Sequence, residues 1–146
     1  MPERISIGSD HAGFAMKAVV ADELRTLGFD VDDVGSHSSD SVDYADYAHV
    51  VARGIEGGEA RRGILLCGTG LGMSYAANRH PGVRAAVAWS PEIAELARQH
   101  NDANVLVLPA RFVDEGAARA IVRTWLATPF EGGRHQKRIA KIEESR

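Results

Sequence analysis

The chain has 146 residues, of which 45% are hydrophobic and 25% charged, and its net charge is −3. These values are typical of one globular domain and exclude a disordered or fibrous chain. The longest charge-free run, residues 63–78, contains four glycines, so the sequence predicts no transmembrane helix, and a single cysteine without a signal peptide favours a cytoplasmic location.

The predicted elements alternate between strands and helices along the chain. First come a strand at residues 4–8, a helix with apolar positions from Met16 to Leu27, a strand at 29–34, a serine-rich loop at 35–41 and a helix at 44–55. Next come a strand at 63–67, a glycine loop, a helix ending near residue 78, a strand at 84–89 and a helix at 90–100 capped by Ser90. A strand at 104–108, a helix at 114–127 and a short basic helix complete the chain.

Five strands separated by helices predict an α/β fold with one domain, residues 1–146. We expect a three-layer α/β/α sandwich with a Rossmann-like, five-stranded parallel sheet, because crossover helices then cover both faces. Such folds bind ligands at the carboxyl ends of their strands. We therefore look for chemistry at that edge.

Two loops leave strands at that edge, residues 8–11 and residues 67–72. The second contains Gly68, Gly70 and Gly72, and glycines between a strand and a helix let backbone amides converge on an anion. A tight turn without a ligand is the alternative. The dinucleotide fingerprint fails because Met73 occupies the position of its last glycine, and no P-loop lysine follows.

Cys67 ends a strand and faces the start of the next helix. The helix N-terminus should lower the pKa of its thiol and make a thiolate available, although inert core packing is the alternative. The histidines are widely spaced and no Cys-x-x-Cys occurs, so the spacing predicts no metal site, and only a site assembled by folding stays open.

The charge is distributed unevenly along the chain. Residues 111–146 contain eight Lys and Arg against five Asp and Glu, whereas residues 1–110 contain nine against fifteen. This small excess suits a small anionic ligand better than a nucleic acid. Arg134 and Arg138 lie four residues apart and share one helical face, which suits a phosphate clamp or a solvated surface.

Five segments together resemble the type B ribose-5-phosphate isomerase family. They are residues 8–14 (GSDHAGF), 43–44 (DY), 66–73 (LCGTGLGM), 98–102 (RQHND) and 131–135 (EGGRH), and they follow the family order over nearly the whole chain. The same family includes isomerases of allose 6-phosphate and galactose 6-phosphate. The resemblance implies interconversion of an aldose phosphate and a ketose phosphate without a metal or other cofactor.

The resemblance also implies roles for individual residues. Cys67 would be the base that moves a proton between C1 and C2, while His100 with Asp10 would open the furanose ring. The enediolate oxygen would lie against the loop formed by Gly68, Thr69, Gly70, Leu71 and Gly72, with Thr69 assisting. The remaining substrate contacts would come from His11, Tyr44, Asn101, Arg111, Arg134 and Arg138. Met73 stands where another branch of the family has a glutamate base, which places the chain in the cysteine branch.

The predicted topology separates two of these residues. Cys67 lies at the carboxyl edge, whereas His100 ends a helix that returns toward the opposite edge, and a five-residue strand is roughly 17 Å long. We therefore expect a homodimer with shared active sites, possibly a dimer of dimers, in which the C-terminal helix packs on the partner. Which subunit supplies Arg111 stays open.

The favoured reaction is the interconversion of ribose 5-phosphate and ribulose 5-phosphate. A six-carbon sugar phosphate is the alternative substrate, and a non-catalytic phosphate- or nucleotide-binding module is the alternative class of function. No nucleic-acid or membrane partner is expected.

Overall fold

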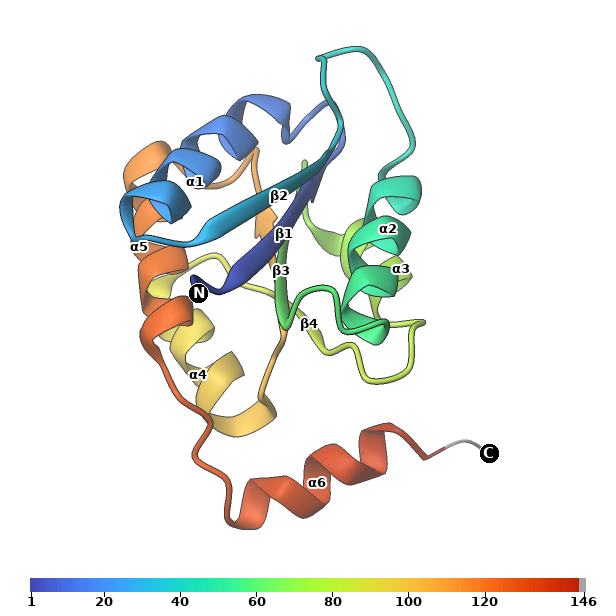
Figure 1. The fold of residues 1–146 in the computed structure, drawn as a ribbon, viewed down its shortest axis with the longest axis vertical. Coiled ribbons are helices and arrows are strands. Elements are labelled where there is room, and N and C mark those ends of the chain that lie inside the picture. Colours follow the sequence, from blue (N-terminus) through green and yellow to red (C-terminus); the bar gives the residue numbers. More distant parts are fainter. Residues whose placement is uncertain (145–146) are drawn as a thin grey trace.

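The computed structural model describes residues 1–144, which form a parallel sheet flanked by helices (Figure 1). The strands are β1 (Arg4–Ser9), β2 (Asp30–Gly35), β3 (Arg62–Cys67), β4 (Ala85–Val87) and β5 (Val105–Pro109). The helices are α1 (Phe14–Thr26), α2 (Tyr44–Glu56), α3 (Leu71–Ala77), α4 (Pro91–Asn101), α5 (Glu115–Ala127) and α6 (Arg134–Ile142). The predicted α/β sandwich with five parallel strands is confirmed.

The strand order is β2-β1-β3-β5-β4, which places β1, β3 and β5 side by side at the centre of the sheet. Ser9 pairs with Leu66, and Cys67 pairs with Pro109. This register brings the segments that follow the three central strands to one edge. The direction of chain crossing also changes between β1 and β3, and such switch points are where open α/β sheets bind ligands.

Each face of the sheet has its own apolar core. On one face α1, α4 and α5 cover the sheet, and Trp125 of α5 is fully buried against the side chains of β1, β3 and β5. On the other face α2 and α3 bury Leu65, Val105 and Val107 (Figure 1). Because both faces are covered, β3 and β5 are continuously apolar rather than alternating, as the sequence predicts for residues 63–67.

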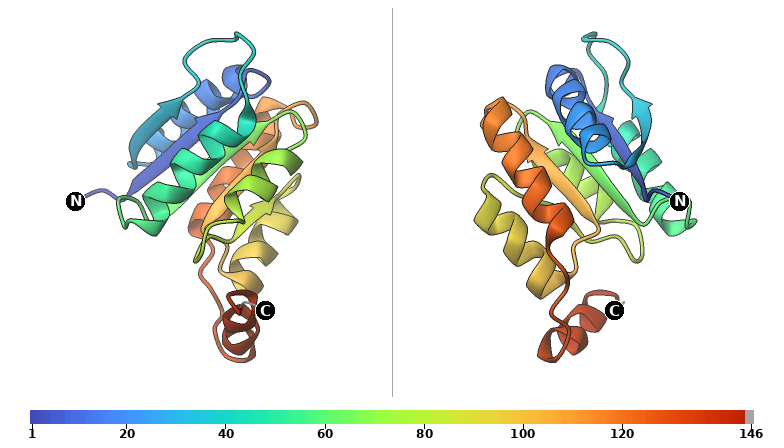
Figure 2. Two further views of the ribbon diagram at one scale, coloured as in Figure 1. Left: turned by 90° about the vertical axis from the view of Figure 1, so that its right-hand side faces the viewer. Right: turned by 60° about the vertical axis from the view of Figure 1, so that its left-hand side comes forward.

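The last helix, α6, stands apart from the three layers, beyond the ends of α4 and α5 (Figure 2). Only His135 and Ile139 of this helix are buried. In the part of the chain that the structure describes, no helix combines the length and the apolar character needed to cross a bilayer.

The fourth strand is shorter than the predicted range of 84–89. The backbone N–H of Arg84 donates to Oδ1 of Asn104 at 2.8 Å instead of to a neighbouring strand. Trp89 at the other end is 59% exposed. As β4 lies at the sheet edge and pairs only with β5, its ends are free to leave the ladder. The predicted cap at Ser90 is confirmed, since its Oγ accepts a hydrogen bond from the N–H of Ile93.

Candidate active site

A cavity of about 280 Å³ opens at the carboxyl edge of the three central strands. Its lining comes from the segment after β1, the start of α2, the glycine loop after β3 and the segment after β5. The lining residues are Asp10, His11, Ala12, Tyr44, Cys67, Gly68, Thr69, Gly72 and Arg111. With the exception of Ala12, all of them are among the site residues predicted from the sequence.

Cys67 lines this cavity and is 4% exposed. Burial raises the pKa of the Cys67 thiol above its usual range, and the negative charge of Asp10 acts in the same direction. Backbone N–H groups of Met73, Gly70 and Thr69 lower this pKa, but less than burial raises it. The prediction that the helix N-terminus lowers the pKa is therefore wrong: the amides do face the sulfur, but desolvation of the thiolate outweighs them.

The glycine loop requires glycine at three positions. Gly70, the cap of α3, has a φ of 78°, which side chains rarely tolerate. A Cβ at Gly72 would fall 2.3 Å from a ring carbon of Tyr44, and one at Gly68 would fall 3.0 Å from the guanidinium of Arg111. The loop backbone therefore lies directly against Tyr44 and Arg111, which line the same cavity.

Asp10 and His11 form the wall that follows β1. Oδ1 of Asp10 accepts a hydrogen bond from the N–H of Gly13 at 3.0 Å, and the residue is 6% exposed. Nδ1 of His11 accepts from the N–H of Val42 at 3.2 Å, which leaves Nε2 as the N–H donor of the neutral ring. The wall therefore combines a fixed carboxylate with a fixed imidazole.

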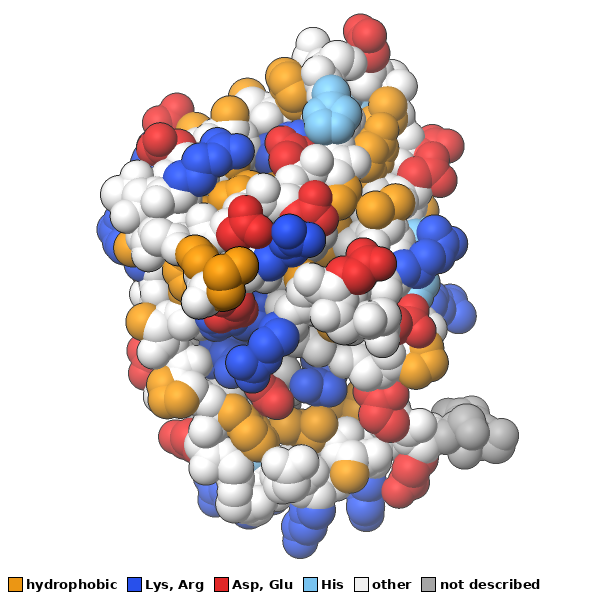
Figure 3. Space-filling view, viewed as in Figure 1, with side chains coloured by type: hydrophobic (Ala, Val, Ile, Leu, Met, Phe, Trp, Pro, Cys, Tyr) orange, Lys and Arg blue, Asp and Glu red, His pale blue; other side chains and the backbone are white. Residues whose placement is uncertain are grey.

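Gly70 and Leu71 of the glycine loop do not line this cavity. Four further predicted site residues lie outside it on other elements: His100, Asn101, Arg134 and Arg138. The first two end α4 and the last two lie on α6, both at the opposite end of the molecule. Basic side chains are visible along this lower end in Figure 3, and both arginines are exposed. His100 and Cys67 of one chain are thus far apart. The predicted topology leads to the same separation.

Sequence reasoning missed the neighbours of His100. Its ring stacks on the ring of His135 at a centroid distance of 4.5 Å, and both imidazoles face Glu131. Glu131 and His135 lie four residues apart, which was the available signal, although Glu131 precedes α6 and the spacing does not place the two side chains on one helical face. The pairing with His100 depends on tertiary structure alone.

A second cavity, of about 240 Å³, lies at the amino ends of the strands. Its lining residues are Glu3, Arg61, Arg62, Arg84, Arg98, Asp102 and Asn104. Although it is rich in arginine, Arg62 donates to both carboxylate oxygens of Glu3, and Arg98 donates to Asp102 at 2.8 Å. Arg62 and Arg98 are therefore already paired with carboxylates of the same chain. The cavity that contains Cys67 is for this reason the better candidate for an active site.

Comparison with known proteins identifies the family of the chain. Residues 5–142 match the family described as Ribose/Galactose Isomerase. The chain belongs to this family. It is 46% identical to ribose-5-phosphate isomerase B of Escherichia coli over 96% of this chain and 94% of that protein.

Solved structures are similar over the same length. The ribose 5-phosphate isomerase of Thermotoga maritima is 54% identical, with a TM-score of 0.96 and coverage of 98% of this chain and 99% of that one. The type B enzyme of Trypanosoma brucei is 45% identical, with a TM-score of 0.95 and 98% of both chains covered. The resemblance noted from the five segments is thereby confirmed.

Proposed function

We propose that residues 1–146 form one isomerase domain that interconverts ribose 5-phosphate and ribulose 5-phosphate through an enediolate intermediate. The observation that carries this proposal is the cavity in which Cys67, Asp10, the glycine loop and Arg111 meet. A base, a row of backbone donors and cationic groups are what an aldose–ketose isomerisation requires. The names of the relatives in Escherichia coli and Thermotoga maritima support the choice of substrate.

Cys67 acts as the base in this proposal. Its thiolate takes the proton from C2 of the aldose, and the electron pair moves to the carbonyl oxygen to give the enediolate. The thiol then returns the proton to C1 of the enediolate. The proton of the C2 hydroxyl moves to the C1 oxygen, which leaves the carbonyl of the ketose at C2. The loop amides from Gly68 to Gly72, together with Thr69, stabilise the oxyanion, and removing one such donor typically costs about 10²–10³ in rate.

The rest of the substrate is held by groups remote from the reacting carbons. His11, Arg111, Arg134 and Arg138 bind the phosphate, and their binding energy fixes C1 and C2 next to the thiolate. Other contacts to the sugar come from Tyr44, Leu71 and Asn101. Because Arg134 and Arg138 lie on α6, far from the cavity of their own chain, the proposal needs a second subunit.

The active unit is accordingly a homodimer with two shared sites. His100 of one chain, assisted by Asp10 of the other, opens the furanose ring beside Cys67 of the other chain. The exposed side of α6, which carries Arg134 and Arg138, then packs on the partner. A two-fold axis makes the two composite sites equivalent.

The proposed reaction is tested by incubating the protein with ribose 5-phosphate and measuring the ketose that forms. In heavy water, deuterium should appear at C2 of the recovered aldose for the wild type and not for Cys67→Ala. Allose 6-phosphate and galactose 6-phosphate serve as the comparison substrates. No turnover of ribose 5-phosphate, or substantial turnover by Cys67→Ala, would refute the proposed substrate or the proposed base, respectively.

A further inference from the structure

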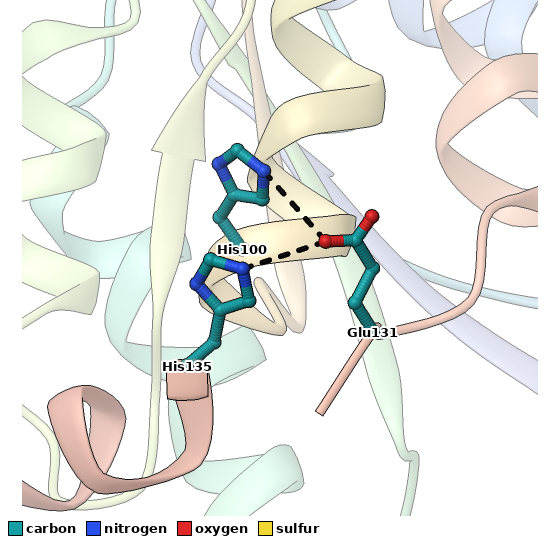
Figure 4. Close-up of side chains that lie close together, drawn as sticks. All are labelled: His100, Glu131 and His135. Atoms are coloured by element: carbon teal, nitrogen blue, oxygen red, sulfur yellow. Dashed lines mark ion pairs between the residues drawn. The ribbon is translucent and has the colours of Figure 1, made fainter. Parts of the chain in front are cut away.

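Three side chains of metal-binding type meet where α4 ends and α6 begins (Figure 4). Oε1 of Glu131 lies 3.8 Å from Nε2 of His100 and 3.4 Å from Nε2 of His135. One ligand atom of each residue lies within 4.8 Å of those of the other two. The separation of His100 from Glu131 and His135 in the sequence hides this cluster.

The backbone holds the cluster in place. The N–H of Glu131 donates to the carbonyl of Gln99 at 3.1 Å, so that Glu131 is fixed beside the neighbouring His100. Gly132 and Gly133, with φ of 70° and 56°, then turn the chain into α6 and carry His135 over His100. The conformation of these two residues favours glycine. The side chain of His135 is 8% exposed, whereas those of His100 and Glu131 are 41% and 50% exposed.

The distances within the cluster suit a shared ion better than direct hydrogen bonds. Both N···O separations exceed the usual upper limit of about 3.2 Å for a hydrogen bond. Ligand atoms bound at about 2.0–2.1 Å in a tetrahedral arrangement lie about 3.3 Å apart. The 3.4 Å between Glu131 and His135 is close to this value, and the 3.8 Å between Glu131 and His100 is longer. The two rings are nearly parallel, at 14°, so His100, which is exposed, must rotate about its side-chain bonds to direct its lone pair to the same point as His135.

A second set of the same residue types provides a contrast. Nδ1 of His49 and Nε2 of His80 lie 2.7 Å apart, within hydrogen-bond distance, and Nδ1 of His80 contacts the carboxylate of Glu56. Each nitrogen of His80 is thus occupied by a neighbouring side chain. These three residues form a hydrogen-bonded chain without a common point for an ion, which makes His80 a matched control.

We propose that His100, Glu131 and His135 bind a divalent transition-metal ion, for which Zn²⁺ is the best match. Two imidazole nitrogens and one carboxylate oxygen are a familiar ligand set for zinc with one position left open. Mg²⁺ and Ca²⁺ prefer sites made of oxygen ligands alone. The open position faces solvent on the side of His100 and Glu131.

Metal binding regulates the proposed active site. An ion that binds Nε2 of His100 removes this imidazole from ring opening, so Zn²⁺ inhibits the enzyme. This consequence rests on the proposed function of His100, whereas binding of the ion does not.

The binding test uses the Cys67→Ala variant, because the thiol would itself bind zinc. We expect calorimetry with ZnCl₂ to show one ion per chain and CoCl₂ to give the visible absorption of tetrahedral cobalt. Adding Glu131→Gln should weaken zinc binding by at least about tenfold. Even the loss of a residue that only hydrogen-bonds to a metal ligand typically lowers metal affinity by that factor. His135→Ala should do the same, and His80→Gln should change nothing. Half-exposed Glu131 tolerates this substitution, and circular dichroism checks that each variant is folded.

The outcomes separate the metal site from the proposed reaction. No zinc binding, equal affinity in Glu131→Gln, or loss of binding in His80→Gln would overturn the site. Turnover of ribose 5-phosphate in the presence of a chelator tests the reaction alone. Zinc binding without turnover would refute the proposed function and leave the site intact. In an active enzyme Cys67 also binds zinc, so inhibition should occur in two steps, one of them due to the cluster. Glu131→Gln should shift the step due to the cluster to a Zn²⁺ concentration at least about tenfold higher and leave the other step in place, and an unchanged inhibition curve would overturn the regulatory role.

Discussion

Subunit mixing tests the shared active site directly. His100 lies nine residues beyond Pro91 on α4, which at 1.5 Å per residue is about 14 Å along a helix that leads away from the carboxyl edge. Cys67 lies at that edge and lines the cavity there. If both residues take part in the reaction, they come from different chains. Homodimers of Cys67→Ala and of His100→Ala should then both be nearly inactive.

The expected recovery follows from counting sites. Random pairing after joint refolding of equal amounts gives about half heterodimers. Each heterodimer has one site that carries both substitutions and one site that carries neither. Activity should therefore return to about a quarter of the wild-type value. Differently tagged chains allow the heterodimer to be purified, and its specific activity should be about half that of the wild type.

A matched control uses two residues of the same cavity. Cys67 and Asp10 line one cavity within one chain, so a heterodimer of Cys67→Ala with Asp10→Ala has one lesion in each site. This mixture should not recover. The shared site would be refuted by heterodimers of Cys67→Ala and His100→Ala that stay inactive, or by recovery in the control.

Four further predictions concern the phosphate contacts, the Cys67 thiol and the cap of α5. Arg134→Ala and Arg138→Ala should each raise KM by about tenfold or more, because each removes a charged hydrogen bond to phosphate, and unchanged steady-state kinetics would mean a merely solvated surface. Since burial raises the pKa of Cys67, kcat/KM should rise with pH above neutrality as thiolate forms, and a flat pH–rate profile would argue against Cys67 as the base. The folded chain also holds this proton more tightly than the unfolded chain. This difference stabilises the folded chain fully at pH values below the pKa of the unfolded chain, and the stabilisation is lost as the pH rises through the pKa of the folded chain. Denaturant unfolding at several pH values should show this dependence in the wild type and not in Cys67→Ala. Finally, Asp114 caps α5 by accepting from the N–H of Ala117 at 2.7 Å, so Asp114→Ala should cost about 1 kcal/mol in denaturant unfolding and Asp114→Asn much less, whereas equal losses would contradict the cap.

The order of the elements could be predicted because its causes are local. Apolar spacing, the cap at Ser90 with Pro91, and glycines at helix ends act within a few residues of the chain. The alternation of strands and helices then leaves a parallel sandwich as the natural fold. The candidate cavity was found for the same reason, because the loops that begin at Gly8 and Cys67 each follow a predicted strand.

Other properties depend on distant parts of the chain. Arg111 joins Asp10 and Cys67 only because β5 pairs with β3, and no local pattern specifies that neighbour. The pKa of Cys67 was predicted with the wrong sign, because the burial that raises it comes from packing by the whole fold. The sequence by itself therefore determined which elements form and which of their ends carry chemistry. Only the tertiary structure decided strand order, desolvation and the meeting of His100 with His135, since each depends on contacts between residues far apart in the chain.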